Sequence, residues 1–130
     1  MLVLGRDHAE TPDGLAGLRD KPFITPCRAD SASFYDHVFR TCRAAGFVPE
    51  VVQETDVFFT ALNLVRAGLG ISIAPSAVQL MRVPQIRFAE TLIPEAEWSF
   101  GLAWNRRLSF SPQMINFRIM AERWITPTVR

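Results

Sequence analysis

Apolar residues recur along the chain in two patterns, one typical of buried strands and the other of amphipathic helices. Short apolar or β-branched runs predict strands at 22–25, 47–53 and 70–74. Between them, apolar residues at three- and four-residue steps predict helices over 31–45 and 56–67. Strand, helix, strand, helix, strand at these lengths is typical of right-handed βαβ crossovers. We therefore predict an α/β fold built on a parallel sheet.

Residues that begin and end helices support these boundaries. Asp30 and Ser31 are N-cap types ahead of the first helix, and Gly46 stands where a C′ glycine belongs. Thr55 or Asp56 is predicted to cap the second helix. Its apolar side is expected to face the core through Val57, Ala61, Leu62, Leu64 and Val65.

Shorter elements are predicted on both sides of this pattern. Before it, we expect a short strand at 2–4 and one helical turn at 15–18. After it, we expect a short helix at 76–81 and strands at 85–88 and 99–104. A last amphipathic helix over 110–124 would carry Phe110, Met114, Phe117 and Trp124 on one side.

Length and composition limit the class of protein. A chain of 130 residues is the size of one domain, and 48% hydrophobic with 21% charged residues argues against disorder. Fourteen basic against 13 acidic residues give a net charge of +1, which excludes a strongly basic nucleic-acid footprint. No apolar run approaches the ~18–20 residues that span a bilayer, and no secretory signal is apparent at the start. We expect a cytoplasmic location, with both cysteines as reduced thiols.

Catalytic and metal-binding motifs are poorly represented. The two histidines, His8 and His37, show no zinc-site spacing with Cys27 or Cys42, and no nucleophile elbow or phosphate-binding loop occurs. We therefore expect no metal, no cofactor and no enzymatic activity. The alternative is a small α/β enzyme that uses Cys27, activated by Arg28 and a helix N-terminus. Rapid alkylation of Cys27 near neutral pH would favour that alternative.

Ligand binding is better supported, at the carboxyl edge of the predicted sheet. Ligands of open α/β folds lie beyond the carboxyl ends of the strands, where helix N-termini point free N–H groups. The loops 25–31 and 54–56 follow two neighbouring strands and bring hydroxyls, an arginine and two helix N-termini to this edge. A simpler interpretation is that the hydroxyls only cap the helices and that one phenylalanine belongs to the core. The candidate contacts are Thr25, Arg28, Ser31 and Thr55, with Phe58 and Phe59 as an aromatic wall.

Three segments carry a resemblance to a known family. Residues 40–49 end in Ala-Gly-Phe-Val-Pro, residues 51–54 end in Gln-Glu, and residues 62–76 read Leu-Asn-Leu-Val-Arg-Ala-Gly-Leu-Gly followed by an apolar strand and Pro-Ser. Their order and spacing resemble the effector-binding domain of LysR-type transcriptional regulators. The likeness extends over about residues 2 to 124, and the segments are specific in combination although each is degenerate alone.

The resemblance implies a type 2 periplasmic-binding-protein-like fold, in which two α/β lobes joined by crossover strands hold a small effector in a cleft. On that pattern, about 5–98 would form lobe two as one βαβαβ unit. Residues 2–4 and 99–124 would be the crossover and lobe-one remnants, including the C-terminal helix. The helix-turn-helix of the family and the first half of lobe one have no counterpart in this sequence.

The implied function is effector sensing, with an organic or aromatic carboxylate as the ligand. Direct binding of nucleic acid by this chain is not expected, since the family binds DNA through the helix-turn-helix; no membrane partner is expected either. A homodimer is expected, because the remnants would leave a strand edge and an apolar helix row uncovered. A transport-type solute-binding protein fragment on the same fold is the main alternative.

Overall fold

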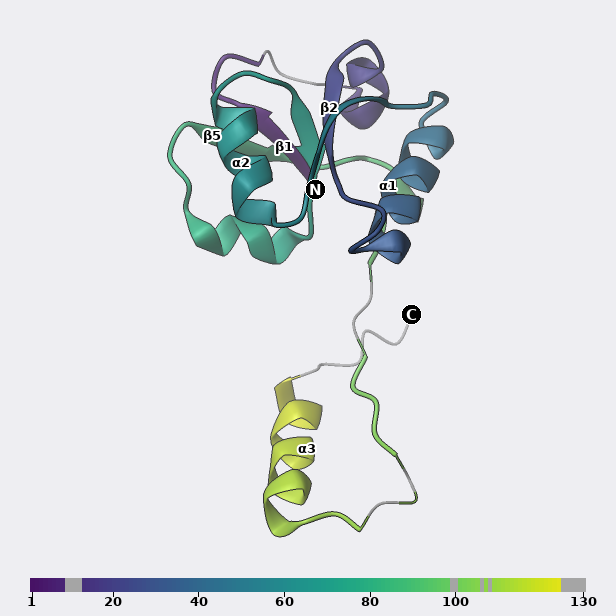
Figure 1. Ribbon diagram of the computed structural model, residues 1–130, viewed down its shortest axis with the longest axis vertical. Coiled ribbons are helices and arrows are strands. Elements are labelled where there is room, and N and C mark those ends of the chain that lie inside the picture. The colour runs from purple at the N-terminus through teal and green to yellow at the C-terminus, as the bar shows by residue number, and fades with distance from the viewer. Residues whose placement is uncertain (9–12, 99–100, 106, 108, 125–130) are drawn as a thin grey trace. The chain divides into compact units, whose positions relative to one another are not determined.

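The computed structural model describes residues 1–8, 13–98, 101–105, 107 and 109–124. Its contacts divide the chain into two compact units, Met1–Trp98 and Ser99–Arg130, which are described separately below (Figure 1). Among the described helices, none is long and apolar enough to cross a membrane.

Five strands form one sheet in the first unit, in the spatial order β3-β2-β4-β1-β5. β2 pairs in parallel with both β3 and β4, which confirms the predicted βαβ pattern. β1 runs antiparallel to β4 and β5, so the sheet is mixed rather than purely parallel. The strands are β1 (Leu2–Gly5), β2 (Pro22–Pro26), β3 (Glu50–Thr55), β4 (Ile71–Ile73) and β5 (Ile86–Ala89).

Two α-helices cover opposite faces of this sheet. On β2, Phe23 belongs to the core under α1 and Ile24 to the core under α2, because successive strand side chains point to opposite faces. The helices are α1 (Ala32–Ala44) and α2 (Phe58–Arg66), and three 3₁₀ turns complete the unit: η1 (Gly14–Leu18), η2 (Ser76–Met81) and η3 (Pro94–Ala96). The buried apolar helix residues are Phe34, Val38 and Cys42 on α1, with Ala61, Leu62 and Val65 on α2, and α1 also buries His37 and Thr41.

The helix ends agree with the sequence in part. Ser31 is the N-cap residue of α1, although its side chain makes no capping hydrogen bond. Gly46 follows α1 with φ +88°, a conformation that favours glycine. The prediction that Thr55 or Asp56 caps α2 is wrong: Thr55 still belongs to β3, and Val57 is the N-cap residue in an extended conformation. Val57 is accordingly 51% exposed and is not a core residue.

Gly70 allows β2 and β4 to approach closely. A Cβ atom at this position would lie 2.5 Å from the carbonyl oxygen of Pro22, closer than real Cβ contacts come. The last glycine of the Ala-Gly-Leu-Gly segment is therefore required by strand packing.

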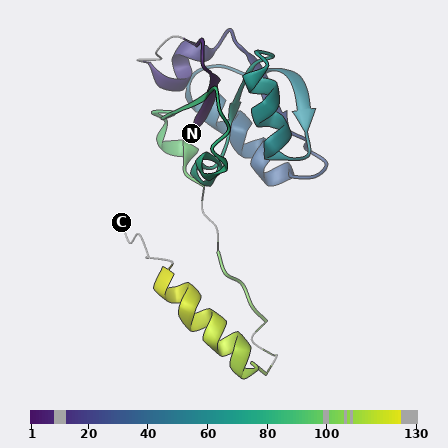
Figure 2. The same cartoon turned by 90° about the vertical axis from the view of Figure 1, so that its left-hand side faces the viewer.

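The second unit contains α3 (Pro112–Trp124), which is seen along its length in Figure 2. The guanidinium of Arg118 lies 5.9 Å from the ring centre of Trp104 and 6.0 Å from that of Phe110, at cation–π distance. Large apolar side chains of α3 are exposed, among them Met114, Phe117 and Met120. The predicted position of Trp124 on this apolar side lies outside the described side chains.

The strand predicted at 99–104 does not form over 101–104, so that prediction is wrong there, while 99 and 100 lie outside the described residues. A strand needs a neighbour to accept and donate its backbone hydrogen bonds. Within the described part of the second unit there is no other strand to pair with it.

Candidate functional site

The loops that follow β2 and β3 are joined by the backbone. The N–H of Cys27 donates a 2.7 Å hydrogen bond to the carbonyl oxygen of Thr55, one step beyond the paired strand residues Pro26 and Thr55. The Cys27 carbonyl in turn accepts from the N–H groups of Asp30 and Ser31, at 3.2 and 3.0 Å. This tight turn sets Ser31 at the start of α1, beside the end of β3.

A small cavity of about 110 Å³ lies at this edge of the sheet. It is bounded by the end of β2, the N-cap of α1, the end of β3, the first turn of α2 and the middle of β4. Because both helices begin here, the unbonded N–H groups of their first turns are directed toward this edge. The lining residues are Pro26, Ser31, Thr55, Asp56, Val57, Phe58, Ala61 and Ser72.

The hydroxyl groups at the cavity differ in how they are used. Ser72 is buried and donates a 2.8 Å hydrogen bond to the carbonyl oxygen of Ile24. Thr55 Oγ1 donates a long, 3.4 Å hydrogen bond to the carbonyl oxygen of Val57. Within the described part of the chain, the Ser31 hydroxyl makes no hydrogen bond. A free hydroxyl of this kind can donate to an anionic oxygen.

Phe58 gives the cavity an aromatic wall. Its ring meets Phe34 of α1 edge to face, with ring centres 5.3 Å apart and an interplanar angle of 83°. Phe34 meets Trp98 in a second edge contact at 4.8 Å, so Phe58 is held by a cluster that links both helices to the end of the unit. Phe59, the next residue, is 59% exposed and does not line the cavity.

The remaining two candidate contacts lie away from the cavity. Thr25 is fully buried on β2, and strand alternation puts it on the α1 face with Phe23, while Pro26 shares the α2 face with Ile24. Arg28 is exposed and forms an ion pair with Asp36, with 3.3 Å between Nε and Oδ1. The structure thus brings together Ser31, Thr55 and Phe58, and leaves Thr25, Arg28 and Phe59 outside the cavity.

Sequence reasoning missed five of the lining residues. Ser72 had a usable signal, since it is the one hydroxyl in the apolar run 70–74. Val57 was assigned to the core by its helical period, although it precedes the helix. The sequence around Pro26, Asp56 and Ala61 contains no pattern that predicts a binding role. They line the cavity because the path of the backbone brings them to it.

The cysteines and histidines form no catalytic group at this cavity. Both thiols are free; Cys27 is half-buried, and burial raises the pKa of Cys42 to about 12. His37 is buried against Trp98, and burial together with Arg40 lowers its pKa from the ordinary value. Neither histidine lines the cavity, and among the described residues no three His, Cys, Asp or Glu side chains could hold a metal ion.

The mixed sheet, the two covering helices and a polar cavity at the carboxyl ends of the strands define an α/β ligand-binding lobe of the periplasmic-binding-protein-like type. The family model described as the LysR substrate binding domain matches residues 1–125. The chain therefore belongs to the LysR substrate-binding domain family, as the resemblance indicated. This selects the regulator family over the transport-type alternative.

Known proteins agree with this assignment. The uncharacterized HTH-type transcriptional regulator YnfL of Escherichia coli is 30% identical over 122 residues, which are 92% of this chain and 41% of YnfL. The BenM effector-binding domain with its effector benzoate matches with a TM-score of 0.62 and 25% identity, over 74% of this chain and 46% of that domain. The LysR family regulator CbnR matches with a TM-score of 0.59 and 31% identity, over 68% of this chain and 32% of CbnR. The chain thus spans less than half the length of each.

Proposed function

We propose that this chain is an effector-sensing region of a LysR-type regulator, where a small organic carboxylate binds and changes how the longer protein holds DNA. The observation that carries the proposal is the cavity at the carboxyl ends of β2 and β3, where α1 and α2 begin. Helix N-termini favour anions, so a carboxylate group suits this edge. The benzoate bound by BenM supports an aromatic acid as the ligand class.

In this proposal the carboxylate accepts hydrogen bonds from the Ser31 and Thr55 hydroxyls and from the first-turn N–H groups. The face of Phe58 packs against the apolar part of the ligand. Arg28 and Phe59 are exposed and follow the lining residues Pro26 and Phe58 closely in sequence. In this proposal they contact the parts of a ligand that extend beyond the cavity. The exposed Arg28–Asp36 pair is worth little, about 0–1 kcal/mol, so Arg28 can exchange partners. Thr25, buried on the other face, supports the strand end and has no direct contact.

A second wall is needed to enclose the ligand. Small-molecule sites usually occupy about 300–1,000 Å³, and the cavity here holds about 110 Å³. The chain also spans only 46% of the BenM domain. We propose that a facing lobe closes on the ligand by a hinge motion, which shifts the population between open and closed states.

The remaining partners follow from the same family. DNA is held by another part of the regulator, since the charge of this chain, +1, provides no basic footprint. We place the protein in the cytoplasm, where a regulator meets DNA, and as a homodimer. No catalytic step is assigned to Cys27.

Titration of the isotope-labelled chain with benzoate tests the proposal. We expect saturable shifts of the backbone amide signals of Ser31, Thr55 and Phe58, with weak affinity because one wall is absent. Ser31→Ala and Thr55→Val should each weaken binding roughly tenfold or more, since each removes one hydrogen bond to a charged group, worth about 1.5–3 kcal/mol. Ser33→Ala and Thr60→Val are matched controls, because both side chains are exposed on the same helices and lie outside the cavity.

Two results would contradict the proposal. One is a benzoate response that does not saturate or that spreads over the surface without including the cavity. The other is equal weakening by the control variants, which would show that the cavity hydroxyls make no specific contact.

A further inference from the structure

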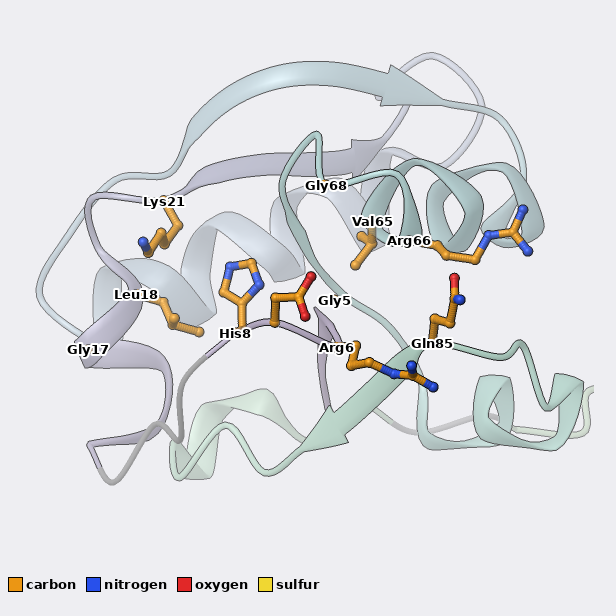
Figure 3. A pocket seen from close by; sticks show the side chains of 11 residues that line it. Gly5, Arg6, His8, Gly17, Leu18, Lys21, Val65, Arg66, Gly68 and Gln85 are labelled. Carbon is orange, nitrogen blue, oxygen red and sulfur yellow. The ribbon is translucent and has the colours of Figure 1, made fainter.

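A larger hollow lies at the opposite end of the sheet from the proposed effector cavity (Figure 3). It has a volume of about 670 Å³, within the usual range for small-molecule sites. Its lining comes from the segment after β1, the segment before β2, the end of α2 and the turn before β5. β2 begins here at Pro22, whereas it ends beside the effector cavity at Pro26. The two sites therefore share no lining residue.

The hollow carries an excess of positive charge. Three cationic side chains, Arg6, Lys21 and Arg66, line it together with one carboxylate, Asp7, which leaves a formal charge of +2. Within the described residues, none of the three cations makes an ion pair or a side-chain hydrogen bond. Concave surfaces of one sign concentrate counter-ions, so these cations are available to an anionic ligand.

His8 lies inside the hollow and has a lowered pKa (Figure 3). Burial lowers the pKa of His8, and the charges of Lys21 and Arg87 lower it further, each outweighing Asp7. Arg87 is held close because its Nη2 donates a 3.1 Å hydrogen bond to the His8 carbonyl oxygen. The ring is therefore neutral near neutral pH and retains one N–H donor for a ligand.

The cations lie on two sides of the hollow, with His8 between them (Figure 3). Arg6 and Arg66 extend on one side with Gln85 between them, and Lys21 lies on the other side (Figure 3). The N–H of Arg6 donates a 3.1 Å hydrogen bond to the carbonyl oxygen of Gln85, which fixes the Arg6 segment against the turn before β5. The buried side chain of Leu18 lies on the side of Lys21 and that of Val65 beside Arg66, with the His8 ring between them (Figure 3).

We infer that this hollow binds a small organic dianion, whose two negative charges match the formal charge of +2. One acidic group would contact Arg6 and Arg66 and the other Lys21, with the His8 ring between them. Arginine pairs with carboxylates through a planar fork, and lysine acts as a point charge. A ligand here occupies the same lobe as the effector without competing for its cavity. The inference stands on the hollow alone and does not require the proposed function.

The test uses glutarate, a dianion, and butyrate, a monoanion of similar apolar length, titrated into the isotope-labelled full chain at low ionic strength. We expect saturable shifts of the amide signals of Arg6, Lys21, Arg66 and Gln85 with glutarate. Butyrate should bind roughly tenfold more weakly or worse, because it lacks the second charged contact.

Variants assign the site. Arg6→Gln and Arg66→Gln should each weaken glutarate binding roughly tenfold, the loss of one charge-assisted contact. Arg43→Gln removes the same charge from an exposed position on α1 outside the hollow and should leave binding unchanged. Urea midpoints of all three variants should match that of the parent chain, which shows that loss of binding is not loss of folding.

Three results would overturn the inference: no saturable glutarate response, equal responses to glutarate and butyrate, or equal weakening by Arg43→Gln. Glutarate shifts confined to Ser31, Thr55 and Phe58 would also overturn it, because the dianion would then occupy the effector cavity. A benzoate titration of the same sample keeps the two proposals separate, since benzoate can fail while glutarate binds, and the reverse.

Discussion

The N–H of Cys27 donates a 2.7 Å hydrogen bond to the carbonyl oxygen of Thr55, and this contact joins the two loops that border the proposed effector cavity. It extends the β2–β3 pairing by one step, so the two loops leave the sheet side by side. Ser31 and Phe58 then face the same small space from the starts of two different helices. A backbone contact, which is independent of side-chain identity, thus brings together groups that are 27 residues apart in sequence.

Phe34 is predicted to contribute strongly to the stability of the first unit. It is 4% exposed and contacts Phe58 and Trp98 in edge geometry. Phe34→Ala should lower the free energy of unfolding by about 3–5 kcal/mol through lost burial and a cavity. Phe59→Ala is the matched control, and because Phe59 is 59% exposed, its effect should stay within about 0.5 kcal/mol. Urea denaturation measures both, and equal losses would contradict the prediction.

Gly70→Ala is predicted to disturb the pairing of β2 with β4. The new methyl group would meet the Pro22 carbonyl oxygen at 2.5 Å, and the backbone must move to relieve the contact. Overpacking of this kind costs about 1–3 kcal/mol. Gly101→Ala adds the same methyl group where nothing lies within 4 Å, so its thermal midpoint should be unchanged. A Gly70→Ala variant as stable as the parent would show that the strands can separate freely.

Stability is predicted to fall as the pH drops below about 6.5, the ordinary pKa of histidine. Burial and Arg40 lower the pKa of His37, and burial with Lys21 and Arg87 lowers that of His8. Between the lowered native pKa and 6.5 the unfolded chain binds more protons, so acid favours unfolding. The stabilisation is complete above pH 6.5 and declines as the pH falls towards the lowered pKa values of His8 and His37 in the folded chain.

Urea midpoints between about pH 5.5 and 7.5 measure this dependence, since carboxylates titrate mainly below that range. The chain has only two histidines, so a His8→Asn, His37→Phe double variant should show a flatter profile. Arg40 donates to Nδ1 of His37 at 2.9 Å, which requires the neutral ring, so the His37 substitution should contribute visibly. If the urea midpoint of the double variant still changes with pH as in the parent chain, the pH dependence belongs to other groups.

Self-association is predicted through the exposed apolar face of α3. Phe117 and Met120 are 62% and 59% exposed, and Met114 on the same helix is exposed as well. Grouped exposed apolar side chains of this kind mark interaction surfaces, whereas single scattered ones are normal on a monomer. Light scattering at tens of micromolar should detect a dimer, and Phe117→Glu with Met120→Glu should convert it to a monomer. Gln113→Glu places a single glutamate on α3 at a polar position and should leave the dimer intact. A monodisperse monomer of the parent chain would contradict this prediction.

The local pattern of apolar residues was sufficient to predict most helices and strands of the first unit. The periodicity of 31–45 and 56–67 corresponds to α1 and α2, and the apolar runs correspond to β2, β3 and β4 within a few residues. Gly46 and Gly68 end their helices with positive φ, as their positions in the sequence indicate. These features depend on neighbours a few residues apart, which is why the sequence reveals them.

The strand expected at 101–104 shows the limit of local pattern. Its apolar residues have the right composition, yet a strand also needs a paired backbone, and the described residues of its unit offer none. In the same way, no local feature reveals that β1 runs antiparallel to its neighbours, because strand direction depends on the path of the whole chain.

The proposed effector cavity could also be predicted only in part. Loop positions at the carboxyl ends of β2 and β3 follow from the βαβ order, so Ser31, Thr55 and Phe58 could be named in advance. Thr25 and Pro26 are adjacent in sequence, but strand alternation sends them to opposite faces, and only the assembled sheet decides which face holds the cavity.

The sequence by itself therefore determined the family, the order of the main elements and the edge of the sheet where the helices begin. Those features are recorded in short-range periodicity and in segments of fixed spacing. The tertiary structure alone decided which side chains line each site, because Ser72 joins the cavity and Gln85 joins the cationic hollow from distant segments. Packing of two helices on opposite faces of one mixed sheet brings those segments together, and no local pattern encodes such long-range contacts.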